Sequence, residues 1–108
     1  MKILAIGDIV GTRAIDHLQK HLWKLRDRMK IDLVVANGEN ATDIHGVNAR
    51  DAKAILDCGV DLITLGNHTY TMRDLHPFLD NNPDVIIRPA NYPASAPGCG
   101  YTVCDVCG

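Results

Sequence analysis

The sequence lacks the marks of several classes of protein. It has no basic surplus, because 11 Lys and Arg residues stand against 13 Asp and Glu residues, and the net charge is −2. Proteins that follow a nucleic-acid backbone or an anionic membrane surface usually carry a basic patch. No apolar run approaches the roughly 18 residues of a membrane span, and the apolar start is too short for a signal peptide. We therefore expect a cytoplasmic protein, with neither polymeric nucleic acid nor a membrane as its partner.

The sequence also lacks a complete cysteine-based framework. Its four cysteines are Cys58, Cys99, Cys104 and Cys107. Without a secretion signal, a set of disulfides is not expected. The pair Cys104 and Cys107 has the spacing of half a zinc knuckle, but no second such pair and no histidine after His76 could complete it. We interpret residues 98–108 as an irregular, cysteine-rich tail with incidental thiols, and metal binding there is the less favoured alternative.

What is present is the composition of a small globular domain. The chain has 108 residues, of which 46% are hydrophobic and 22% charged, enough for one core. Apolar runs at 2–6, 33–36, 62–65 and 85–87 predict four strands. Between the first two runs, apolar residues recur at spacings of three and four, which predicts one face of a helix: Ile15, Leu18, Leu22, Leu25 and Met29. Asn48 is a suitable N-cap for a second helix that ends at Gly59, with Ala52, Ile55 and Leu56 inward, and a short third helix is expected around 74–79.

This alternation of apolar strands and helices predicts an α/β fold. Strands that are apolar throughout are typical of a parallel sheet covered on both faces, here with βαβαβ connectivity. Right-handed crossovers then bring the loops after the first three strands to a single edge of the sheet. Open α/β sheets bind their ligands at that edge.

Each of the first three strands is followed by glycine and then by a side chain that carries oxygen. The three pairs are Gly7-Asp8, Gly38-Glu39 and Gly66-Asn67. Glycine allows a sharp, close-packed turn that a Cβ atom would hinder, so the next side chain can point over the sheet edge. We expect the three side chains to converge there.

The converging residues have the chemistry of a divalent metal site. Asp8 and Glu39 offer carboxylate oxygens, Asn40 and Asn67 offer amide oxygens, and His68 offers an imidazole. A cation would also relieve the repulsion between the two carboxylates. Any one of these residues taken alone is more often part of a turn. Their repetition after three successive strands favours a functional site.

Other residues and motifs carry less information. His17, His21, His45 and His76 have no comparable setting, and we expect them to be solvated or partly packed. A nucleotide-binding module is the competing interpretation of an α/β sheet with a glycine loop. However, residues 7–11 match neither the GxGxxG fingerprint nor a Walker loop, and Asp8 stands where a phosphate cradle requires bare amides. That class stays as a minor alternative.

Four sequence motifs together resemble those of the YmdB-type branch of the calcineurin-like metallophosphoesterases. They are Gly7-Asp8-Ile9-Val10-Gly11, Asn37-Gly38-Glu39-Asn40-Ala41, Gly66-Asn67-His68-Thr69 and Arg88-Pro89-Ala90-Asn91-Tyr92-Pro93. Their order and spacing fit that branch over residues 1–97. The resemblance implies that 1–97 is the N-terminal half of a metallophosphoesterase domain, half of an α/β/β/α sandwich, and that the tail 98–108 lies at a truncation point.

The resemblance also implies a function. It implies two divalent metal ions, commonly iron or manganese, and the hydrolysis of phosphodiesters, including 2′,3′- or 3′,5′-cyclic nucleotides. Asp8 and Asn40 would be ligands of the first metal, Glu39 would bridge both, and Asn67 would bind the second. His68 would be the proton donor, with a metal-bound hydroxide as the nucleophile.

The sequence departs from the wider superfamily at three points. Val10 stands in place of a histidine and Glu39 in place of the bridging aspartate, but both changes are shared by the YmdB-type branch. The family also completes its metal site with histidines from a second half, whereas no histidine follows His76. A second hypothesis is therefore a non-catalytic, truncated metal- or nucleotide-binding α/β module. The truncated sheet would expose an edge and an apolar face, which favours self-association.

Overall fold

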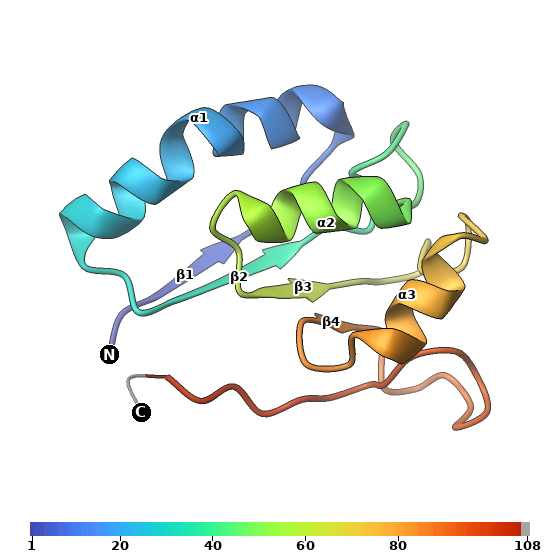
Figure 1. The fold of residues 1–108 in the computed structure, drawn as a ribbon. Coiled ribbons are helices and arrows are strands. Elements are labelled where there is room, and N and C mark those ends of the chain that lie inside the picture. The colour runs from blue at the N-terminus through green and yellow to red at the C-terminus, as the bar shows by residue number, and fades with distance from the viewer. Residues whose placement is uncertain (107–108) are drawn as a thin grey trace.

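The computed structural model describes residues 1–106 and has the predicted α/β fold (Figure 1). Its single sheet contains β1 (Ile3–Ile6), β2 (Leu33–Asn37), β3 (Leu62–Thr64) and β4 (Ile86–Ile87), all parallel and in the order of the sequence. Three helices, α1 (Gly11–Met29), α2 (Ala49–Asp57) and α3 (Leu75–Asn81), alternate with the strands. Within residues 1–106, no helix is both long and apolar enough to cross a membrane.

The two longer helices form as their sequences predict. In α1, Ile15 and Leu22 are buried, whereas Met29 at the last helical position is 49% exposed, so its predicted inward position is wrong. Met29 lies where the chain leaves the helix, because Lys30 adopts a left-handed conformation (φ 55°) that reverses the chain toward β2. In α2, the Asn48 side chain accepts a hydrogen bond from the backbone N–H of Asp51 at 2.7 Å, which confirms the predicted cap.

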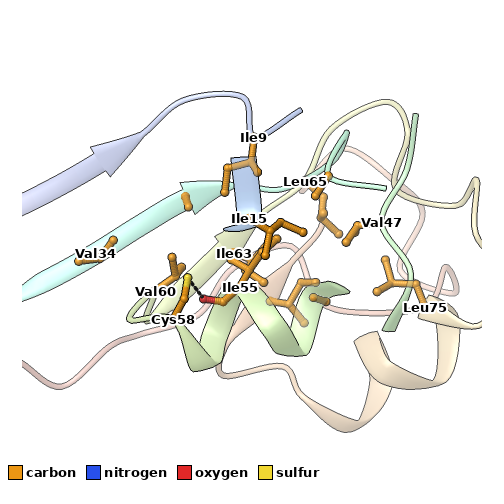
Figure 2. Close-up of a cluster of buried hydrophobic side chains, with 14 of the residues drawn as sticks. Ile9, Ile15, Val34, Val47, Ile55, Cys58, Val60, Ile63, Leu65 and Leu75 are labelled. Atoms are coloured by element: carbon orange, nitrogen blue, oxygen red, sulfur yellow. Dashed lines mark hydrogen bonds between the residues drawn. The ribbon is translucent and has the colours of Figure 1, made fainter. Parts of the chain in front are cut away.

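The core lies between the sheet and the helices (Figure 2). One cluster of buried side chains contains Val34 and Ile63 from the strands together with Ile15 of α1, Ile55 of α2 and Leu75 of α3. All five are buried, with no more than 3% of their surface exposed. This apolar contact fixes the helices against the sheet and so holds the loops at its carboxyl edge.

Only one face of the sheet carries α1 and α2, so the prediction of cover on both faces is wrong for residues 1–106. Figure 1 shows these helices above the strands and the chain after β4 beneath them. On the other face, Ile3 of β1 is 54% exposed. The reason is topological: when strand order follows sequence order, right-handed crossovers place successive helices on the same side.

The chain after β4 has no helix or strand up to residue 106. It folds back to the end of β4, where the backbone N–H of Arg88 donates to the carbonyl oxygen of Cys99 at 3.0 Å. Cys58, Cys99 and Cys104 are free thiols, and burial raises the pKa of the Cys58 thiol. Cys107, the partner of Cys104 in the predicted half-knuckle, lies outside the described residues.

Candidate metal centre and active site

Backbone hydrogen bonds join the three loops at the carboxyl edge of the sheet. Each runs from the amide of one loop to a carbonyl of the neighbouring strand end or loop, at about the ideal length. They are Ile9 N–H to Asn37 O (3.0 Å), Gly11 N–H to Asn40 O (3.1 Å) and Gly38 N–H to Thr64 O (3.0 Å). The loops after β1, β2 and β3 therefore form one connected surface.

Two predicted ligands meet directly on this surface. The Asn40 side-chain amide donates a hydrogen bond to Asp8 Oδ1 at 2.9 Å, although the residues are 32 positions apart in sequence. The amide oxygen of Asn40 is buried and has no hydrogen-bond partner within residues 1–106. A buried acceptor without a partner costs free energy, and a cation beside Asp8 would satisfy it.

Glu39 and His68 form a second pair. One carboxylate oxygen of Glu39, Oε2, accepts a hydrogen bond from the backbone N–H of His68 at 3.2 Å and lies 3.7 Å from His68 Nδ1. Both side chains are mostly buried, with 17% of Glu39 and 29% of His68 exposed. The turn that follows is closed by its own backbone, through Thr69 N–H to Gly66 O and Thr71 N–H to His68 O. The His68 side chain faces a carboxylate, and the hydrogen bonds that close this turn come from Thr69 and Thr71.

The glycine before each ligand has a different role in each loop. At Gly66, an added Cβ would lie 2.5 Å from Glu39 Oε2, so the carboxylate occupies the space of the missing side chain. At Gly38, the Cβ would lie 3.0 Å from a methyl group of Ile63. At Gly7, nothing lies within 4 Å. The close-approach argument holds strongly at Gly66 and more weakly at Gly38, but it is wrong for Gly7.

The fifth predicted residue, Asn67, directly follows Gly66 and is exposed. Within residues 1–106, no group of three or more His, Cys, Asp and Glu side chains lies close enough to hold a metal ion. A metal at this edge would therefore also take amide oxygens, and the unpartnered oxygen of Asn40 beside Asp8 fits that need. The donor set, two carboxylates with amide oxygens and an imidazole, fits a divalent cation.

The structure adds one residue that the sequence did not indicate. The ring of His45 lies beside the ring of His68, with centroids 4.5 Å apart and planes tilted by 41°. His45 is exposed, in agreement with the expectation, but one side of its ring lies against His68. The other three histidines lie away from this contact: His17 and His21 are exposed on α1 with their rings 4.4 Å apart, and His76 is half-buried in α3.

A hollow of about 340 Å³ lies away from these residues, and Arg88, Tyr92 and Tyr101 are part of its lining. Arg88 is buried, and its two terminal nitrogens donate to the carbonyl oxygens of Pro89 and Pro93. These bonds fold the chain after β4 around the guanidinium group. Nearby, burial raises the pKa of the Tyr70 phenol, whose hydroxyl donates to the carbonyl oxygen of Pro97.

Comparison with known proteins identifies the family. The family model described as YmdB-like protein matches residues 4–108. The chain belongs to the YmdB-like family. A 2′,3′-cyclic-nucleotide 2′-phosphodiesterase from Bacillus subtilis (strain 168) is 37% identical over 102 residues, which are 94% of this YmdB-like chain but only 38% of the relative.

Two solved structures are similar to this chain in fold and sequence. A crystal structure of a hypothetical protein from Thermus thermophilus matches the whole YmdB-like chain with a TM-score of 0.89 and 37% identity. A novel phosphatase from Mycoplasma pneumoniae matches 93% of it with a TM-score of 0.83 and 29% identity. The chain covers 41% and 37% of these two proteins, so it corresponds to well under half of each.

Proposed function

We propose that the full-length protein containing this chain is a metal-dependent phosphodiesterase that acts on small nucleotide phosphodiesters, in particular 2′,3′-cyclic nucleotides. The observation that carries the proposal is the convergence of Asp8 with Asn40, and of Glu39 with His68, at the carboxyl edge of the parallel sheet. Membership of the YmdB-like family supports it, as does the name of the Bacillus subtilis relative. The net charge of −2 also suits a small substrate better than a polymer.

The proposed cofactors are two divalent ions, iron or manganese, which carboxylate, amide and imidazole ligands suit. Asp8 and Asn40 would hold the first ion, Asn67 would hold the second, and Glu39 would bridge them. When bound, the ions would neutralise charge on the phosphoryl oxygens and lower the pKa of water to a useful range. Glu39 is suited to a bridging place because its carboxylate lies against Gly66, the residue directly before Asn67.

His68 is placed to act as the proton donor. Its Nδ1 atom faces Glu39 Oε2 at 3.7 Å, which leaves Nε2, on the other side of the ring, for the substrate. Hydrolysis of a cyclic nucleotide releases a ribose oxygen as an alkoxide, a poor leaving group that requires a proton. An imidazole is a common proton donor for such a leaving group. The contact with Glu39 would orient the donor.

The test compares two substrates in the full-length protein with manganese. His68→Ala should lower turnover of 2′,3′-cyclic AMP by about 100-fold or more, the usual contribution of a general acid. It should lower turnover of bis(p-nitrophenyl) phosphate far less, because nitrophenolate leaves without a proton, and elemental analysis should show unchanged metal content. The matched control is His21→Ala, on the exposed face of α1.

Two results would count against these assignments. Equal losses on both substrates, or loss of metal from the His68→Ala protein, would reject the donor role. A full-length protein that binds manganese at this edge but hydrolyses neither substrate would favour the non-catalytic metal-binding module.

A further inference from the structure

The contact between His45 and His68 joins two loops of the proposed active site. His68 follows β3, and His45 belongs to the loop between β2 and α2, yet their ring centroids are only 4.5 Å apart. Nδ1 of His68 faces Glu39. The orientation of the His68 ring is therefore set by two neighbours, the Glu39 carboxylate at its edge and the His45 imidazole beside it. His45 can orient the His68 ring only if its own loop is held in place.

The loop that carries His45 is anchored at its start. The backbone N–H of Thr42 donates to the carbonyl oxygen of Gly46 at 2.9 Å, which closes residues 42–46 into a tight turn. The Thr42 hydroxyl donates to the buried carboxylate of Asp51 in α2 at 2.5 Å and accepts from the backbone N–H of Asn48 at 3.1 Å. Thr42 and Asp51 are both about 95% buried, so this end of the loop is fixed to α2.

The other end of the loop is fixed to the loop that carries His68. Gly46 has a φ of 90°, and a Cβ there would lie 2.9 Å from Cβ of Thr71, three residues after His68. Asp43 (φ 49°) and Ile44 (φ 77°) also adopt left-handed conformations, which are uncommon for aspartate and strained for a β-branched residue such as isoleucine. Such conformations persist only where the surroundings impose them, and they cluster at functional sites.

We propose that His45 is a positioning residue of the active site: it packs against the His68 ring and keeps Nδ1 directed at Glu39 and Nε2 directed at the leaving group. This inference rests on the proposed function. His45 acts through packing, so an aromatic ring at this position is what the reaction requires, and its ring nitrogens are dispensable. Without that ring, the partly exposed His68 side chain gains rotational freedom, and its proton is delivered less often in the right geometry.

The test measures kcat and KM of the full-length protein with manganese for 2′,3′-cyclic AMP and bis(p-nitrophenyl) phosphate. His45→Ala should lower kcat for the cyclic nucleotide about tenfold, with KM changed by less than about twofold, since a misplaced catalytic group costs turnover more than binding. The nitrophenyl ester, which does not need the proton, should change by less than about twofold. His45→Phe should restore most of the lost turnover, because a phenyl ring fills the same place.

Two further variants sharpen the test. His17→Ala, at an exposed histidine of α1 whose ring lies beside His21, is the matched control and should leave both activities unchanged. The double variant His45→Ala, His68→Ala should be no slower than His68→Ala alone, because a residue that acts only through His68 has no effect once His68 is gone.

The outcomes separate this inference from the proposed function. An active protein whose His45→Ala variant is unimpaired, or whose His45→Phe variant is as slow as His45→Ala, would overturn the positioning role alone; the second result would show that the imidazole nitrogens themselves are used. A further loss in the double variant would overturn it as well. A wild-type protein without metal-dependent hydrolysis would overturn the proposed function, and this inference with it.

Discussion

At the scale of single residues, the candidate site requires a glycine at position 66, because a side chain there would collide with Glu39. The Glu39 carboxylate lies where a Cβ of residue 66 would stand, with Oε2 2.5 Å from that position. No real Cβ atom tolerates such a distance from a carboxylate oxygen. The glycine of the Gly66-Asn67-His68 motif is therefore required by the position of Glu39, 27 residues earlier in the chain.

This close approach makes Gly66→Ala a sharp test of the Glu39 site. The added methyl group must displace the carboxylate, so manganese affinity of the full-length protein should fall about 10- to 100-fold, as it does when the groups around metal ligands are disturbed. Titration calorimetry with manganese measures the change. The matched control is Gly7→Ala, because a Cβ at Gly7 has nothing within 4 Å and its affinity should be nearly unchanged. Unaltered manganese affinity in Gly66→Ala would show that Glu39 is not a ligand.

At the scale of elements, the cap of α2 connects helix stability to the site. The Asn48 side chain accepts from the N–H of Asp51, while the Asn48 backbone N–H donates to Thr42, the anchor of the loop that carries His45. Residues at this position satisfy a helix N–H group that otherwise has no partner. One asparagine thus ends the loop and begins the helix.

We predict that Asn48→Ala lowers the free energy of unfolding by about 1 kcal/mol, the usual value of an N-cap. Asn48→Asp should cost much less, because a carboxylate oxygen accepts the same hydrogen bond and suits the positive end of the helix. Urea denaturation followed by circular dichroism measures both. Equal destabilisation by the two substitutions would mean that the cap is not the source of the effect.

Most elements could be predicted from the sequence, because their signals are local. The apolar spacing that includes Ile15 and Leu22, and the polar Asn48 before α2, act within a few residues of themselves. The contact of His45 with His68 could not be predicted in this way. It depends on left-handed backbone at Asp43 and Ile44, which neither residue type suggests, and on packing between loops that are distant in sequence. The sequence could predict which residues lie at the end of a strand. It could not predict where a side chain in the middle of a loop would lie.

At the scale of the whole molecule, the sheet has an apolar face that α1 and α2 do not cover. Ile3 is 54% exposed on β1, and its register partner Leu33 on β2 lies beside it on the same face. The sequence patterns of β1 and β2 are apolar on both sides, as is typical of strands buried on both faces. An apolar face of this kind is a surface for association when it is left open to water.

We therefore predict that residues 1–108, produced alone, self-associate through this face. Sedimentation velocity should show a weight-average mass that rises with concentration in the micromolar range, and Ile3→Lys should move the chain toward the monomer, because a charge at the centre of an apolar contact is costly to desolvate. Met29→Lys is the matched control, since Met29 is similarly exposed at 49% but belongs to α1, which covers the opposite face of the sheet. A chain that stays monomeric at all concentrations, or an equal effect of the two substitutions, would show that the open face of the sheet does not drive association.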